Sequence, residues 1–160
     1  MNIKMSDNDY IAELQLELKA TEAFLSLLRK EQEALVGGDI EHLEALPRDK
    51  AELVMQLAKL AKRRDQRLIS RGLSRDRKGM ETLLADSHDA MTATAKWHEL
   101  LRLAEEVQQL NQINGEIIAT RLRHNQRTLG ALQSASGTTP LYGPTGKTFA
   151  LKGGRQLGQV

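Results

Sequence analysis

The spacing of apolar residues in segment 8–36 is the strongest constraint on the fold. Alternating steps of three and four residues separate Ile11, Leu14, Leu18, Leu25, Leu28 and Leu35, with Thr21 and Gln32 in the remaining positions of the pattern. This heptad spacing places all of these side chains on one face of an α-helix. The segment therefore predicts a long amphipathic helix packed against other helices, and Leu16, Phe24 and Leu27 are expected to widen its apolar face.

Glycine and proline divide the next stretch into a second helical region. Gly37 and Gly38 are expected to end the first helix, because glycine tolerates the left-handed conformation at a helix C-terminus. Asp39 is expected to cap a short turn over 39–46, and Pro47 to begin a new helix that runs through 48–70. Gly72 should close that helix, a polar loop should cover 71–79, and 80–86 should form a turn or two of helix.

A third and longer helix is predicted from about residue 90. Its seam reads Trp97, Leu100, Ala104, Val107, Asn111, Asn114, Ile118, Arg121, Asn125, Thr128 and Leu132, and further apolar residues lie on neighbouring faces. At about 1.5 Å per residue, some 40 residues would make a rod of roughly 60 Å. A helix that is apolar on several sides needs more than one partner element.

Composition agrees with an all-α fold. Aromatic residues make up only 3% of the chain and there are three prolines among 160 residues, which suits long helices better than a β-sandwich. We expect an antiparallel helical bundle or coiled-coil hairpin of about three long helices with a short connecting helix. Six of the 12 glycines lie in 134–160, which also contains no acid. The expected organisation is a bundle domain over 1–133 and a flexible tail over 134–160.

The residues of common active sites do not gather in any recognisable pattern. There is no cysteine, and none of the four histidines has another histidine four residues away. Residues 143–148 resemble the end of a phosphate-binding loop, but Leu141 stands where the motif needs glycine. We therefore expect no enzymatic activity, no catalytic residues, no metal and no cofactor. The sequence also shows no membrane-spanning run and no secretory pattern, so a cytoplasmic location is expected.

A basic stretch over 62–78 allows two interpretations. It holds eight bases and two acids, which a nucleic-acid site would also show. Cations at the C-terminal end of a helix give the same composition, and the stretch contains no aromatic residue for base stacking. We expect no nucleic-acid binding here.

Three features favour binding to other proteins. The third helix carries more apolar surface than a small bundle can cover. Asn111 and Asn114 lie on its seam, where either burial or exposure is possible, and Gly115 beside them could permit close approach or a kink. In the tail, Leu141, Tyr142 and Gly143 resemble a short docking motif on a mobile tether.

These elements, taken in order, resemble the FlgN-type flagellar export chaperones. The resemblance rests on the segment from Glu31 to Asp39, on Leu110-Asn111-x-x-Asn114-Gly115 after Trp97, on Arg123-His-Asn125, and on Leu141-Tyr142-Gly143-x-x-Gly146. Together they cover nearly the whole chain. The resemblance implies a cytoplasmic chaperone without enzymatic activity that holds the terminal amphipathic helix of the hook-associated proteins FlgK and FlgL.

The resemblance also implies site residues. Tyr142, with Leu141 and Gly143, would contact the export-gate protein FlhA. The cargo surface is expected on the third helix, at Asn111, Asn114, Gly115, Ile118, Leu122, Leu129 and Leu132, the last four being our inference from expected exposure. The alternatives from other classes are a structural coiled-coil protein that self-associates, for example as a homodimer, and, ranked below it, a helical nucleic-acid-binding protein that uses residues 62–78.

Overall fold

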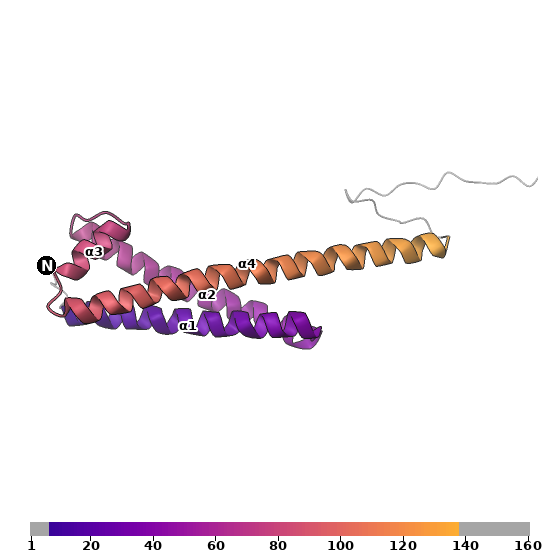
Figure 1. Cartoon of the computed structure of the whole chain (residues 1–160), viewed down its shortest axis with the longest axis horizontal. Helices are drawn as coiled ribbons and strands as arrows, with labels where there is room; N and C mark the ends of the chain where they lie inside the picture. The colour runs from indigo at the N-terminus through magenta and orange to yellow at the C-terminus, as the bar shows by residue number, and fades with distance from the viewer. Residues whose placement is uncertain (1–6, 138–160) are drawn as a thin grey trace, which may run out of the picture. The chain divides into compact units, whose positions relative to one another are not determined.

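The computed structural model describes residues 7–137, which form four helices (Figure 1). They are α1 (Asp7–Gly37), α2 (Ile40–Ser70), α3 (Arg77–Ala85) and α4 (Ala90–Ala135). The expected all-α fold, with three long helices and a short connecting one, is confirmed. The chain divides into two compact units at Ile118 and Ala119, and each is described by itself. The domain boundary expected at 133/134 stays a prediction.

A tight turn joins α1 to α2. Gly38 has a φ of +71°, the left-handed conformation that glycine adopts without steric cost. The Asp39 amide donates back to the Ala34 carbonyl at 3.0 Å, which closes the end of α1. The Asp39 carboxylate then accepts from the His42 amide at 3.2 Å and so caps α2 directly. Helix α1 thus ends at the glycines as predicted, with Gly38 alone in the left-handed conformation, and Asp39 is a cap as predicted, but it caps α2 and not a short turn over 39–46.

The expected break before Pro47 is wrong. Helix α2 begins at Ile40 and passes through Pro47 without interruption. Because Asp39 caps α2 directly after the turn, no residues remain for a separate short element between α1 and α2. Proline lacks the N–H that would bond to the Leu43 carbonyl, so α2 loses one backbone bond there, and the exposed position limits the penalty.

A short connection leads from α2 to α3. Gly72 has a φ of +70° and closes α2 as expected. Helix α3 begins at Arg77, earlier than the predicted 80, because the Asp76 carboxylate caps it by accepting from the Gly79 amide at 2.9 Å. A Cβ on Gly79 would lie 1.9 Å from the Ser74 carbonyl oxygen, so this position has room only for glycine.

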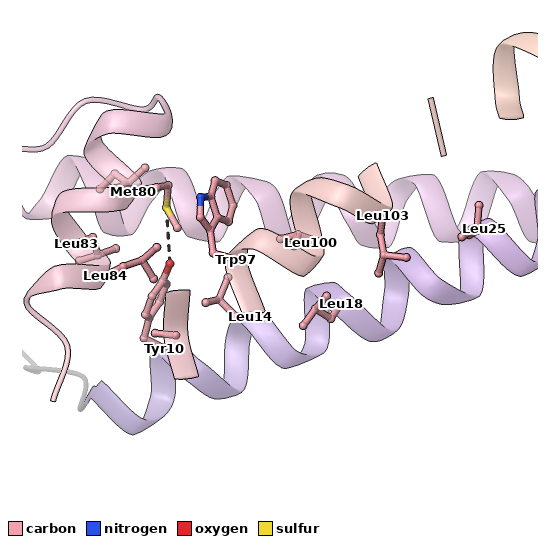
Figure 2. Packing of buried hydrophobic residues seen from close by; sticks show 12 residues of the cluster. Tyr10, Leu14, Leu18, Leu25, Met80, Leu83, Leu84, Trp97, Leu100 and Leu103 are labelled. Atoms are coloured by element: carbon pink, nitrogen blue, oxygen red, sulfur yellow. Dashed lines mark hydrogen bonds between the residues drawn. The ribbon is translucent and has the colours of Figure 1, made fainter. Parts of the chain in front are cut away.

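The core of the first unit lies between α1, α3 and the first half of α4 (Figure 2). Its buried residues are Tyr10, Leu14, Leu18 and Leu25 of α1, Leu68 of α2, Met80, Leu83 and Leu84 of α3, and Ala93, Trp97, Leu100 and Leu103 of α4. The heptad face predicted for α1 therefore forms the core. Phe24 and Leu27 are buried too, whereas Leu16 is 51% exposed and does not widen the face as expected, since it lies on the side away from the other helices.

Tyr10 fixes one end of this core. Its hydroxyl donates to the Met80 sulfur at 3.6 Å (Figure 2). Arg67 stacks over its ring, with the guanidinium carbon 5.0 Å from the ring centre. Burial raises the pKa of the Tyr10 hydroxyl well above its usual value of 10.0, so the side chain stays neutral at physiological pH. A neutral tyrosine can remain in this apolar setting at little cost.

Ion pairs join α1 to α2 along the antiparallel hairpin. Glu13 pairs with Arg67 at 2.8 Å, Glu17 with Arg64, and Glu31 with Lys50 at 3.1 Å. The first two arginines belong to the basic stretch 62–78. Arg64 also stacks over Trp97, with its guanidinium carbon 5.3 Å from the ring centre. Part of the basic stretch therefore holds the fold together, a role that the sequence did not suggest.

Candidate functional site

The most distinctive surface of α4 is a row of exposed apolar side chains near its C-terminal end. Ile118 is 45% exposed, Leu122 57%, Leu129 58% and Leu132 61%. With Asn125, which is also exposed, they are spaced by four, three, four and three residues. This is heptad spacing, so the five side chains share one face of the helix. We call these five residues the apolar stripe.

The stripe lies mainly in the second unit. Within residues 119–137 every side chain is exposed except that of Ala119, which is half-buried. Solvent-exposed leucines at heptad spacing on a helix are typical of a surface that packs against another helix. The four cargo residues that the sequence analysis expected to be exposed are all exposed here.

The two seam asparagines differ in their surroundings. Asn111 is exposed, whereas Asn114 is buried with 1% exposure. The buried seam of α4 continues through Leu103, Val107 and Leu110 to residue 114, and position 111 falls outside that spacing. Periodicity alone allowed either answer for both residues, because the chain has apolar residues on several faces of this helix.

Asn114 belongs to a hydrogen-bond network that joins three helices. Its side-chain amide donates to the Leu28 carbonyl at 2.9 Å and to the Glu31 carboxylate at 2.8 Å. Lys50 of α2 donates to both oxygens of the same carboxylate at 3.1 Å. Asn114 therefore docks α4 onto α1 in the first unit. A direct contact between its side chain and cargo would require this joint to open, so we give Asn114 a positioning role.

Gly115 does not mediate a close approach. A Cβ built on it would meet nothing within 4 Å among the residues that the structure describes, and its φ is not positive. Helix α4 runs through this position as one element. The two roles considered for Gly115, a close contact and a kink, therefore find no support within the described chain, and the structure does not explain this glycine.

An apolar groove opens between α2 and α4 over α1. Its volume is about 370 Å³, and it is lined by Glu17, Thr21 and Phe24 of α1, Leu57, Ala58, Ala61 and Arg64 of α2, and Trp97, Leu100, Leu101, Ala104 and Val107 of α4. No local pattern in the sequence predicted this groove. Three of the lining residues are alanines, and small side chains on facing helices leave space between the helices. These alanines are the sequence feature that could have predicted the groove.

Metal-ligand clusters and membrane-spanning helices are both absent from the described residues. Within 7–137 no group of three or more histidine, cysteine, aspartate or glutamate side chains is arranged to hold a metal ion. Over the same residues, no helix is both long and apolar enough to cross a bilayer. Leu141, Tyr142 and Gly143, the expected gate-docking residues, lie outside the described residues, so their role stays a prediction.

Comparisons with known proteins agree with the resemblance seen in the sequence. The model of the FlgN protein family matches residues 1–149. The flagella synthesis protein FlgN of Proteus mirabilis is 30% identical over 136 residues, which cover 84% of this chain and 86% of that protein. A crystal structure of a flagella synthesis protein FlgN from Pseudomonas aeruginosa matches with a TM-score of 0.65 and 27% identity, covering 79% of this chain and 94% of that one. The chain belongs to the FlgN family.

Proposed function

We propose that this protein is a cytoplasmic export chaperone for the hook-associated proteins FlgK and FlgL, and that it is not an enzyme. The apolar stripe of α4 holds the terminal amphipathic helix of the cargo, and Tyr142 with Leu141 and Gly143 directs the complex to the export-gate protein FlhA. Family membership supports a role in flagellar synthesis. The observation that carries the cargo site is the exposure of Ile118, Leu122, Leu129 and Leu132 at heptad spacing.

The energetics of the stripe suit a carrier that must release its cargo. Covering a half-exposed leucine or isoleucine gains about 1 kcal/mol, so four of them give about 4 kcal/mol. A micromolar complex needs a binding free energy of about 8 kcal/mol. The part that the stripe does not supply must come from polar contacts and from contacts near the backbone of the cargo helix. An interface of this size can mask an aggregation-prone helix and still dissociate without ATP.

The direct test is the mass of the complex. The full-length protein mixed with purified FlgK or FlgL at micromolar concentration is expected to give a complex containing both proteins in multi-angle light scattering. A stable oligomer of the chaperone alone, with no mass gained from either cargo, would favour the self-associating coiled-coil protein over the chaperone.

Replacing Tyr142 by alanine is expected to separate the two binding events. Because Tyr142 belongs to the proposed docking motif and not to the stripe, Tyr142→Ala should leave cargo affinity within about twofold and weaken FlhA binding about tenfold or more, as the loss of an aromatic anchor does. Titration of the variant with FlgK or FlgL measures cargo affinity, and titration of the loaded variant with FlhA measures gate binding. Unchanged FlhA binding by the variant would remove Tyr142 from the proposal.

A further inference from the structure

Charge is distributed very unevenly along the chain. All 21 acidic residues lie at or before Glu116. Residues 119–137, which carry most of the apolar stripe, contain Arg121, Arg123 and Arg127 and no aspartate or glutamate. The described part of the second unit is therefore purely cationic, and its exposed apolar side chains lie in a positive electrostatic field.

The three arginines lie at different distances from the stripe. Successive residues turn by about 100° around an α-helix, so Arg121 flanks the stripe beside Ile118 and Asn125, which lie three and four residues away from it. Arg123 and Arg127 fall on the opposite side of the helix, where Arg123 donates to the Thr120 hydroxyl at 3.1 Å. Only Arg121 can contact a helix docked on the stripe, whereas the other two act on it through the field.

We propose that the occupant of the stripe is a partner's amphipathic helix whose polar flanks are acidic. The inference rests on the proposed function and specifies the chemistry of its cargo. Charge complementarity selects this occupant over a second copy of the chain, since two stripes from two copies would bring two acid-free, arginine-bearing helices together. Asn125 adds a second requirement, because it is a polar residue among the leucines of the stripe. The docked helix presents a polar side chain opposite Asn125.

The two groups of arginines have separable effects on binding kinetics. Long-range attraction raises the rate at which oppositely charged partners meet and is screened by salt over about 8–10 Å. Arg123 and Arg127 therefore affect association. Arg121, beside the leucines, affects both association and the lifetime of the complex.

Two synthetic probes test the charge preference. Both are three-heptad helical peptides with leucine at the a and d positions and asparagine at one of them, with either glutamate or lysine at every e and g position. At about 20 mM NaCl the full-length protein is expected to bind the acidic peptide at least tenfold faster than the basic one, and the difference should vanish near 500 mM NaCl.

Charge-reversal variants test the placement. For the acidic peptide at low salt, Arg123→Glu with Arg127→Glu should lower the association rate about three- to tenfold and leave the dissociation rate within about twofold. Arg121→Glu should lower the association rate and raise the dissociation rate. The matched control is Arg63→Glu with Arg71→Glu, two exposed arginines of the first unit, which should leave both rates within about twofold.

The outcomes separate this inference from the proposed function. If FlgK or FlgL binds but the acidic and basic peptides bind at equal rates, the charge preference is wrong and the chaperone role stands. Equal effects of the two double variants also overturn it, because the field would then not belong to the stripe. A dimer of the chaperone that excess acidic peptide does not dissociate assigns the stripe to a second copy. If neither FlgK, FlgL nor either peptide binds, both proposals fail.

Discussion

Replacing Asn114 by aspartate is expected to lower the free energy of unfolding by about 3 kcal/mol at pH 7, one of the largest effects of any single substitution in the first unit. The change puts a carboxylate where an amide now donates to Glu31 at 2.8 Å, in a position with 1% exposure. Two buried carboxylates at this distance repel each other, and the bond to the Leu28 carbonyl is lost as well.

The pH dependence of this variant identifies the cause. Burial and the neighbouring Glu31 carboxylate raise the pKa of the carboxyl introduced by Asn114→Asp above its unfolded value of about 3.9. A raised folded pKa means that stability is fully present below the unfolded pKa and is lost as pH rises through the folded one. The loss of unfolding free energy caused by Asn114→Asp should therefore be smaller at pH 5 than at pH 7. Asn114→Ala, which only removes the donor, should cost about 2 kcal/mol with little dependence on pH.

Asn111 provides the matched control on the same helix. It is exposed, so Asn111→Asp adds the same charge in water and should change the free energy of unfolding by less than about 0.5 kcal/mol. Urea unfolding followed by circular dichroism at pH 5 and pH 7 measures all three variants. Equal effects of the two aspartate substitutions would mean that residue 114 is not the joint between α4 and α1.

Truncating the leucines of the stripe is expected to weaken cargo binding without loss of fold. Leu122→Ala or Leu129→Ala should each weaken the complex with FlgK or FlgL about fivefold, and the two together about thirtyfold, because each removes apolar surface that only the cargo covers. Both side chains are more than half exposed, so the free energy of unfolding should stay within about 0.5 kcal/mol. Isothermal titration calorimetry and urea unfolding give the two quantities.

Leu16 is the control for this pair. It is an exposed leucine on α1, with 51% exposure, and it lies outside the stripe. Leu16→Ala should leave cargo affinity within about twofold. A general loss of affinity in all three variants would point to nonspecific apolar contact, and full affinity in the double variant would move the cargo site elsewhere, with the groove between α2 and α4 as the next surface to probe.

Heptad spacing predicted the buried residues correctly where a helix has a single apolar face. In α1 the pattern alternates cleanly, and its leucines Leu14, Leu18, Leu25 and Leu28 are all buried. In α4 apolar residues occur on several faces, so the sequence did not show which asparagine would be buried. The break expected at Pro47 was wrong although Asp39 was expected as a cap, because the helix that begins at this cap continues through Pro47 with the loss of one backbone hydrogen bond.

Of the candidate site, only the exposure of the stripe could be predicted from the sequence of the helix that carries it. The leucines of the stripe were expected to be exposed because the third helix was predicted to be longer than the helices that pack against it, and they are exposed. The groove needs three helices at once, since its lining comes from residues more than 80 positions apart, such as Glu17 and Val107. Likewise the pairing of Glu31 with both Lys50 and Asn114 is a tertiary contact without a local signature.

The ion pairs of the α1–α2 hairpin have a consequence for how the chain can vary. In each pair the two residue numbers add to 80 or 81: Glu13 with Arg67, Glu17 with Arg64, and Glu31 with Lys50. All three pairs therefore share one antiparallel alignment about the same turn. A shift of α2 by one residue along α1 would therefore misplace all three acid–base pairs at once, including the one nearest the far end of the hairpin. The alignment of the two helices is thus selected by charges on helical turns remote from the connection that joins them.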